Sequence, residues 1–225
     1  MLYIVPTPIG NLEDITFRAI NTLKKVDRIL CEDTRHSKRL LDHYEIKKPL
    51  TSFHSHSNEK QIANIIEKLK SGENIALISD AGTPGISDPA WALVKALHEE
   101  KLEYTALPGP TAFVPALNLS GFPTDRFFFQ GFLPLKKGRQ TLLKNWKENL
   151  GDYTIVLYES PHRIEKTLGQ LSDIFEPTRQ IALVRELTKI HEECIRGSLE
   201  EITENKSNIT LKGEFVVLIA PENFG

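Results

Sequence analysis

The chain has 225 residues and a nearly balanced charge, with 28 Lys and Arg against 30 Asp and Glu and a formal net charge of −2. Its hydrophobic content of 40% and charged content of 26% are ordinary for a globular protein, and the length suits one large domain or two lobes. This composition excludes a disordered chain and a protein that binds nucleic acid through its overall charge. Any nucleic-acid contact would need a local basic patch.

The cysteines and the first residues predict a cytoplasmic protein. The chain has two cysteines, Cys31 and Cys194, which favours a reducing compartment, and acidic neighbours disfavour a nucleophilic thiolate at both. The first apolar run follows no basic segment and ends at Pro6, so we expect no signal peptide. We expect no membrane partner, because no segment has the roughly twenty apolar residues of a membrane span.

Strand and helix patterns alternate through the first half of the chain. We expect Asp14 to cap the first helix, Gly72 to end the third, and Asp88 to cap the fourth, which begins at Pro89. The predicted strands span 2–5, 28–31, 74–78 and 103–107, and the predicted helices span 15–26, 37–43, 62–69, 89–97 and 111–120.

The motif GFPTDRF, which begins at Gly121, predicts a boundary between two periodic halves. Beyond it, we expect a helix from Pro161 with Ser160 as its cap, and a capping box formed by Ser198 and Glu201. The alternation predicts an α/β fold with two lobes, residues 1–120 and 121–225, and a ligand cleft between them. The predicted strands of the second half span 127–131, 154–158, 181–185 and 215–220, and the segment 191–197 could be another strand.

The most informative segment is the loop over residues 79–89, which reads SDAGTPGISDP. It follows a predicted buried strand and precedes a helix, the position where open α/β sheets bind their ligands. Gly82 and Gly85 permit positive φ or close approach of the backbone, Pro84 stiffens the loop, and Asp80 offers a carboxylate. A rigid connector is the alternative, although an ordinary connection needs only about two to six residues.

The loop after the first strand, PTPIGN, also lies where a cofactor would bind. It is not a GxGxxG fingerprint, and no GxxxxGK[ST] motif occurs in the chain. Because Pro6 and Pro8 have no N–H group to donate to a phosphate, the loop favours a ligand without phosphates.

Charged residues follow the second strand in the motif CEDTRH. Glu32 and Asp33 lie beside Arg35 and His36, with Arg39 further along, so this edge could face a phosphate or an acidic substrate. A solvated, ion-paired turn is the alternative interpretation.

Two histidines, His54 and His56, lie in the polar segment SFHSHSNE. No Cys or His pair at zinc spacing accompanies them, so we expect no metal. A substrate contact or an ordinary polar loop explains them better.

Charges also gather at predicted strand ends in the second half, in YESPHR over 158–163 and RELTK over 185–189. The coincidence of charged strand ends in both halves favours a shared cleft. A further basic cluster of Lys136, Lys137 and Arg139 is interpreted as a solvated loop.

Eight segments together resemble the family of ribosomal RNA small-subunit methyltransferase I, which has the tetrapyrrole-methylase fold. They read PTPIGNLEDIT, CEDTRHSKRLL, SFHSHSNE, SDAGTPGISDP, LPGPTAFVPAL, GFLP, YESPHRI and VRELTK and cover nearly the whole chain in order. The resemblance implies S-adenosyl-L-methionine (SAM) as methyl donor, bound between two α/β domains, and a homodimer. It implies 2′-O-methylation of a cytidine in the decoding region of 16S ribosomal RNA in the small ribosomal subunit.

The resemblance also implies a set of cofactor-binding residues: Pro8, Ile9, Gly10, Asp80, Gly82, Thr83, Thr111, Ala112, Tyr158 and Val184. Glu32 and Asp33 are the candidate bases for the hydroxyl proton, with Arg35 and Arg163 expected to clamp RNA phosphates. The full set of predicted RNA contacts is Arg35, His36, Arg39, His162, Arg163, Arg185 and Lys189.

Two other functions stay open. A SAM-dependent methyltransferase could act on a tetrapyrrole or another small molecule, although tetrapyrrole methylases usually carry a GxGPGD-type first loop where this chain has PTPIGN. A non-catalytic protein could bind ribosomal RNA without consuming SAM. Members of the resembled family often have Gly where this chain has Ala90, and many continue into a small C-terminal helical domain that we do not expect here.

Overall fold

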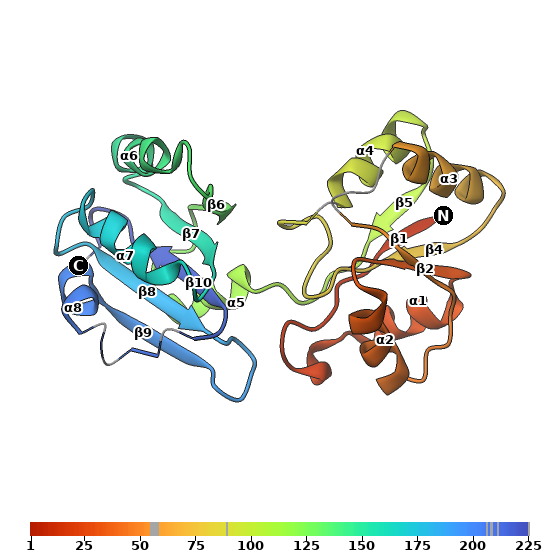
Figure 1. The fold of residues 1–225 in the computed structure, drawn as a ribbon, viewed down its shortest axis with the longest axis horizontal. Coiled ribbons are helices and arrows are strands. Elements are labelled where there is room, and N and C mark those ends of the chain that lie inside the picture. The colour runs from red at the N-terminus through yellow and green to blue at the C-terminus, as the bar shows by residue number, and fades with distance from the viewer. Residues whose placement is uncertain (55–58, 89, 206, 208, 211, 225) are drawn as a thin grey trace. The chain divides into compact units, whose positions relative to one another are not determined.

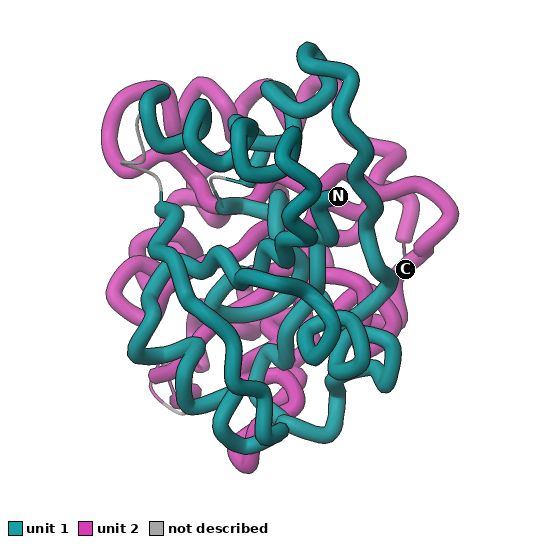
Figure 2. Tube along the Cα trace, turned by 90° about the vertical axis from the view of Figure 1, so that its right-hand side faces the viewer, with its two compact units in different colours: residues 1–111 teal, residues 112–225 magenta. Residues whose placement is uncertain are grey.

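The computed structural model describes residues 1–54, 59–88, 90–205, 207, 209–210 and 212–224. It divides into two compact units, Met1–Thr111 and Ala112–Gly225 (Figure 2). The division lies before the expected boundary at 120/121, because helix α5 (Phe113–Ser120) packs on the sheet of the second unit. Among the described residues, no helix has both the length and the apolar character to cross a membrane.

Unit 1 is built on a five-stranded parallel sheet in the order β3-β2-β4-β1-β5. Its strands are β1 (Leu2–Ile4), β2 (Arg28–Cys31), β3 (Leu50–Ser52), β4 (Ile75–Leu77) and β5 (Tyr104–Ala106). Because all five run in the same direction, their carboxyl ends lie along one edge of the sheet, and the loops that follow them meet there.

Helices cover both faces of this sheet, as Figure 1 shows. Side chains that alternate along β2 divide between two cores: Leu30 packs with α3 and α4, whereas Ile29 and Cys31 pack with α1 and α2. Unit 1 is therefore an α/β domain, as the alternation of patterns predicted, and the structure shows that it is doubly wound. Its helices are α1 (Phe17–Lys25), α2 (Thr34–His43), α3 (Glu59–Lys70) and α4 (Ala90–Glu99), with a short 3₁₀ turn η1 (Leu12–Asp14).

Unit 2 has a mixed five-stranded sheet in the order β6-β7-β10-β8-β9, with β6 and β7 parallel and the other neighbours antiparallel. Phe215, at the start of β10, is opposite Glu159 on one side and Arg185 on the other. The charged ends of β7 and β8 therefore lie at the same edge of this sheet. Its strands are β6 (Phe127–Phe132), β7 (Thr154–Glu159), β8 (Gln180–Arg185), β9 (Glu193–Ser198) and β10 (Phe215–Ile219).

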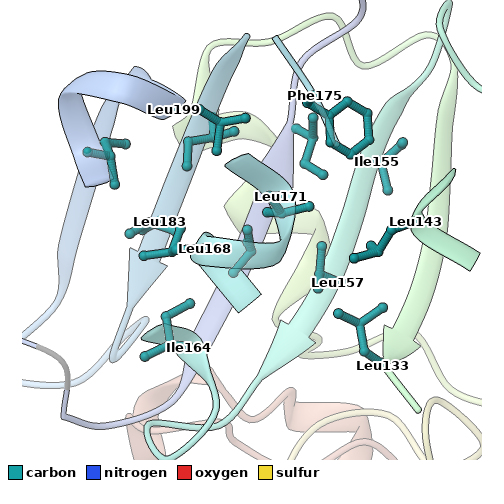
Figure 3. Close-up of a cluster of buried hydrophobic side chains, with 14 of the residues drawn as sticks. Leu133, Leu143, Ile155, Leu157, Ile164, Leu168, Leu171, Phe175, Leu183 and Leu199 are labelled. Carbon is teal, nitrogen blue, oxygen red and sulfur yellow. The ribbon is translucent and has the colours of Figure 1, made fainter. Parts of the chain in front are cut away.

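Three helices, α6 (Arg139–Asn149), α7 (Ile164–Ser172) and α8 (Leu199–Glu204), build the main core of unit 2 on one face of the sheet. Figure 3 shows Leu168 and Leu171 of α7 lying over strand side chains such as Leu157. Full burial of each such leucine contributes about 1.5–3 kcal/mol to folding. Helix α5 packs against strands β7 to β10 from outside this cluster.

Several predicted helix boundaries are wrong for local reasons. Thr16, not Asp14, caps α1, because its hydroxyl accepts the Ala19 N–H at 3.0 Å. Helix α7 begins only at Ile164, and the residues after Ser160 form a turn.

Other predictions hold at the level of single contacts. Ser198 and Glu201 form the expected capping box. The Asp88 carboxylate accepts the Ala90 N–H at 2.9 Å, although Pro89 lies outside the described residues.

Two elements escaped the sequence patterns. Strand β3 has only three residues, too few to show an alternation. Helix α6 begins at Arg139, which we had interpreted as part of a solvated loop. That interpretation is wrong, since Arg139 is 3% exposed and belongs to the interior of unit 2.

Candidate functional site

Two loops of unit 1 join directly at the carboxyl edge of the parallel sheet. Thr7, after β1, and Gly82, after β4, exchange backbone hydrogen bonds of 2.9 and 3.0 Å. The buried Thr7 hydroxyl donates to the Ser79 carbonyl at 3.0 Å, and the Ser79 hydroxyl donates to the Gly82 carbonyl at 3.0 Å. These bonds fix the PTPIGN loop against the 79–89 loop.

A third loop, which follows β5, packs on the same place. Gly82 has a φ of +83°, and a Cβ built there would lie 3.3 Å from Ile9 Cγ2 and 3.7 Å from the Pro110 carbonyl oxygen. The Thr83 hydroxyl donates to that same carbonyl at 2.8 Å. The structure thus brings together four of the predicted cofactor residues, Ile9, Gly82, Thr83 and Thr111.

Close packing behind these loops requires a second glycine. A Cβ on Gly109 would lie 2.6 Å from Cβ of Pro6, a distance that real Cβ atoms do not reach. Sequence reasoning singled out Gly82 but missed the parts of Thr7, Ser79 and Gly109. The prolines and glycines around them signalled a rigid loop without indicating its partner.

Carboxylates line the neighbouring part of this edge. Asp80 accepts the Asp33 N–H at 3.2 Å. Burial, followed by the negative charges of Asp80 and Asp88, raises the pKa of the half-buried Glu32. A cluster of this kind favours a cationic group over an anionic one.

The two candidate bases differ in their surroundings. Asp33 is the N-cap of α2, and its carboxylate accepts the N–H groups of Arg35 at 2.7 Å and His36 at 3.4 Å. These hydrogen bonds lower the pKa of Asp33. Glu32 has the higher proton affinity and no capping role, which makes it the better candidate for a base.

Helix α2 presents its predicted RNA contacts to solvent. The Arg35 side chain is 94% exposed, and His36 and Arg39 are also exposed. Ser37 and Leu41 are the buried residues of the same helix. The spacing therefore places two arginines and a histidine on the solvated side of the helix.

In unit 2, the motif YESPHR forms a buried ion network instead. Glu159 Oε2 lies 3.3 Å from Arg139 Nη2, and Oε1 lies 3.2 Å from Arg163 Nε. The Thr167 hydroxyl donates to Glu159 at 2.6 Å, and the Ser160 N–H donates at 2.9 Å. Burial lowers the pKa of Arg139, and the charge of Glu159 opposes that effect.

The motif RELTK at the end of β8 is also held by ion pairs. Arg185 Nε lies 3.1 Å from Glu193 Oε2, and Lys189 Nζ lies 2.8 Å from carboxylate oxygens of both Glu186 and Glu214. Glu186 has a φ of +50°, so the turn is a tightly constrained one. These contacts give the Arg185 and Lys189 side chains structural roles within the unit.

The remaining predicted residues lie at scattered places. Val184 is fully buried in β8, and Tyr158 is half-buried in β7. Ala112 precedes α5 without a side-chain cap. His162 is exposed in the turn before α7, and Pro8 and Gly10 flank Ile9 in the first loop of unit 1.

The structure offers no assembled metal site in the part of the chain it describes, where no group of three or more His, Cys, Asp or Glu side chains could hold an ion. His56, one of the two histidines considered for a metal, lies outside the described residues.

Comparisons with known proteins place the chain in a family. A family model described as tetrapyrrole (corrin/porphyrin) methylases matches residues 1–203. A ribosomal RNA small subunit methyltransferase I from Hydrogenobaculum sp. (strain Y04AAS1) is 48% identical over 99% of this chain and 96% of its own length. The protein of that name from Synechocystis sp. (strain ATCC 27184 / PCC 6803 / Kazusa) is 47% identical over 98% of this chain and 78% of its own.

A solved structure of diphthine synthase aligns with a TM-score of 0.75 over 97% of this chain and 89% of that one, at 13% identity, which is evidence for the fold alone. With the fold, the three joined loops and the near-complete match in agreement, the chain belongs to the tetrapyrrole methylase family.

Proposed function

We propose that this protein is a SAM-dependent methyltransferase of small-subunit ribosomal RNA, and that it methylates the 2′-oxygen of a cytidine ribose in the decoding region. The observation that carries the proposal is the similarity of 47–48% over nearly the whole chain to proteins named ribosomal RNA small subunit methyltransferase I. In such an enzyme, the three joined loops of unit 1, which follow β1, β4 and β5, would hold the cofactor.

The residues of unit 1 fit SAM in their chemistry. SAM carries a sulfonium and an ammonium group and no phosphate. The carboxylates of Glu32 and Asp80 suit a cation, and the prolines of the PTPIGN loop remove N–H groups that a phosphate would need. Ile9, Gly82 and Thr83, with Pro8, Gly10, Asp80 and Thr111 beside them, would hold the cofactor from this unit.

When bound, SAM supplies an electrophilic methyl group on a positively charged sulfur. The role of the protein is first to hold the acceptor hydroxyl in line, which can contribute about 7–11 kcal/mol. A general base accelerates the reaction by a factor of roughly 10²–10⁴, which corresponds to about 3–5 kcal/mol. Positioning therefore contributes more to the rate than the general base does.

Glu32 is the residue that we propose takes the proton from the ribose hydroxyl. Burial and the neighbouring carboxylates raise its pKa, which makes it a stronger base than an ordinary glutamate. Asp33 then acts through α2, since its carboxylate holds the helix end that carries Arg35 and His36.

Three exposed side chains of α2, Arg35, His36 and Arg39, are the candidate RNA contacts of unit 1, and His162 is exposed in unit 2. We also propose a homodimer in the cytoplasm that acts on the small ribosomal subunit. Arg163, Arg185 and Lys189 stay candidate RNA contacts, although their ion pairs already account for their positions.

The test is methyl transfer from labelled SAM to unmodified small ribosomal subunits, with naked 16S ribosomal RNA and a tetrapyrrole precursor in parallel. Label on a cytidine ribose of the decoding region is the expected result. Label on the precursor would make the protein a small-molecule methyltransferase. RNA binding without SAM binding or label would make it a non-catalytic RNA-binding protein.

A further inference from the structure

The segment after β6 in unit 2 exposes an unusual set of side chains. Phe132, the last residue of the strand, is 51% exposed, and Leu135 is 74% exposed. Lys136 and Lys137 follow, both exposed. Within the described residues, neither lysine has a carboxylate within ion-pair distance. An aromatic ring and two uncompensated cations thus lie within six residues of one another along a surface loop.

Phe132 is not a loosely attached ring. Its centroid lies 5.6 Å from that of Tyr158, in an edge-on arrangement, and Tyr158 in turn lies 5.1 Å from Phe129. Phe129 stacks on Phe113 of α5 at 4.7 Å. This row of aromatic rings holds Phe132 from one side while about half of its surface stays open to solvent.

A bulge in β6 gives Phe132 its place in the row. Strand β6 shifts register between Phe129 and Gly131, and Gly131 has a φ of +70°. After the shift, Phe132 is opposite Tyr158, whereas Phe129 is opposite Val156. Because Val156 and Tyr158 are two residues apart on one strand, they lie on the same face, and so do Phe129 and Phe132.

The loop between Leu133 and Arg139 is tied at both ends to one buried carboxylate. At its start, Arg163 Nη2 donates to the Leu133 carbonyl at 2.6 Å and to the Pro134 carbonyl at 3.4 Å, while Arg163 Nε pairs with Glu159. At its end, Arg139 pairs with the same Glu159. The network of Glu159 therefore holds the loop that presents Lys136 and Lys137.

We propose that this aromatic-basic loop, residues 132–137, is an RNA-binding element in which Phe132 stacks on a base and Lys136 and Lys137 contact phosphates. The inference rests on the proposed function, because it names a further binding surface for the same substrate. Stacking on a held aromatic ring beside cations is the combination by which proteins bind single-stranded nucleic acid. A protein partner fits less well, since lysine is depleted from the centres of protein interfaces.

The experiment measures binding of the full chain to unmodified 16S ribosomal RNA across a series of salt concentrations. We expect the double variant Lys136→Ala/Lys137→Ala to flatten the log–log salt slope by about 1.4–1.8. Phe132→Leu keeps an apolar side chain in the row, and we expect it to weaken RNA binding about 5-fold or more with little change in slope. The control Lys144→Ala/Lys166→Ala removes the same charge from exposed positions of α6 and α7 and should leave both quantities near their original values.

SAM affinity, the thermal unfolding midpoint and the sedimentation of the variants are measured as well. SAM affinity and the thermal unfolding midpoint of both loop variants should equal those of the unaltered protein. RNA affinity and slope unchanged in both loop variants would overturn the inference alone. A change in sedimentation, with RNA affinity preserved, would overturn it in favour of contact with a second copy of the chain. Failure of the unaltered protein to bind RNA would overturn the proposed function and this inference with it.

Discussion

The strand ends of the two units carry similar charged motifs but use them in different ways. In unit 1, Glu32 and Asp80 lie at a partly open edge, and Arg35 is almost fully exposed. In unit 2, Glu159 is buried and paired with two arginines. The same sequence pattern thus produces an accessible edge in unit 1 and a buried ion network in unit 2. Burial, which depends on the surrounding helices, makes the difference.

The sharpest test of this comparison measures the stability of two single variants, Glu159→Gln in unit 2 and Asp80→Asn in unit 1. Removing the charge of Glu159 leaves Arg139 buried without a counter-ion, so we expect a loss of about 3–5 kcal/mol in the free energy of unfolding. Asp80→Asn keeps an acceptor for the Asp33 N–H, so we expect a loss below about 1 kcal/mol but weaker SAM binding. Denaturant unfolding and calorimetric titration measure the two effects. Equal stability losses would remove the distinction between the units.

Glu32→Gln tests the chemistry of the open edge. A base must be deprotonated to act, and the pKa of Glu32 is raised, so methyl transfer should fall as the pH drops through that raised pKa. We expect Glu32→Gln to reduce kcat at least about 100-fold at neutral pH and to abolish this acid limb. The control Asp33→Asn retains an N-cap for α2 and should keep both the activity and the limb. A Glu32→Gln enzyme with full kcat would contradict the assignment.

Gly82→Ala tests the packing of the loops. An alanine at a φ of +83° costs about 1–2 kcal/mol, and here its Cβ would also press on Ile9. Gly72→Ala is the matched control, because Gly72 has a φ of +94° with nothing within 4 Å of the added carbon. We expect Gly82→Ala to lose somewhat more stability than Gly72→Ala, because only its Cβ meets a neighbour, and to be the only one of the two that loses SAM affinity. Comparable SAM affinities would place the cofactor elsewhere.

The smallest expected effect belongs to Arg35→Ala. Its side chain is 94% exposed, so the free energy of unfolding should change by less than about 0.5 kcal/mol. We expect RNA binding to weaken and the log–log salt slope to flatten by about 0.7–0.9, with SAM affinity unchanged. Filter binding and calorimetry measure these quantities. A large loss of SAM affinity would instead place Arg35 at the cofactor.

Much of the fold could be predicted because apolar strand and helix patterns alternate regularly along the sequence. The strand over 28–31 matches β2 residue for residue, and the alternation of strands and helices predicted the α/β class. The antiparallel pairing of β10 with β7 and β8 could not be read in the same way, since apolar runs look alike in either direction. Helix α6 was missed because its first residue, Arg139, looks like a surface cation in sequence.

By itself, the sequence determined the class of the fold, the loops at the carboxyl edge of unit 1 and the resemblance that the comparisons support. Glycines, prolines and charged residues that follow a strand are local signals, because they can be recognised in the sequence without knowing their partners. Only the tertiary structure decided that Thr7 pairs with Gly82, that Asp33 caps a helix beside the more basic Glu32, and that Arg139 and Arg163 share one buried carboxylate. The reason is physical: burial and partners from distant segments set the role of a charge, and neither is encoded in its immediate neighbours.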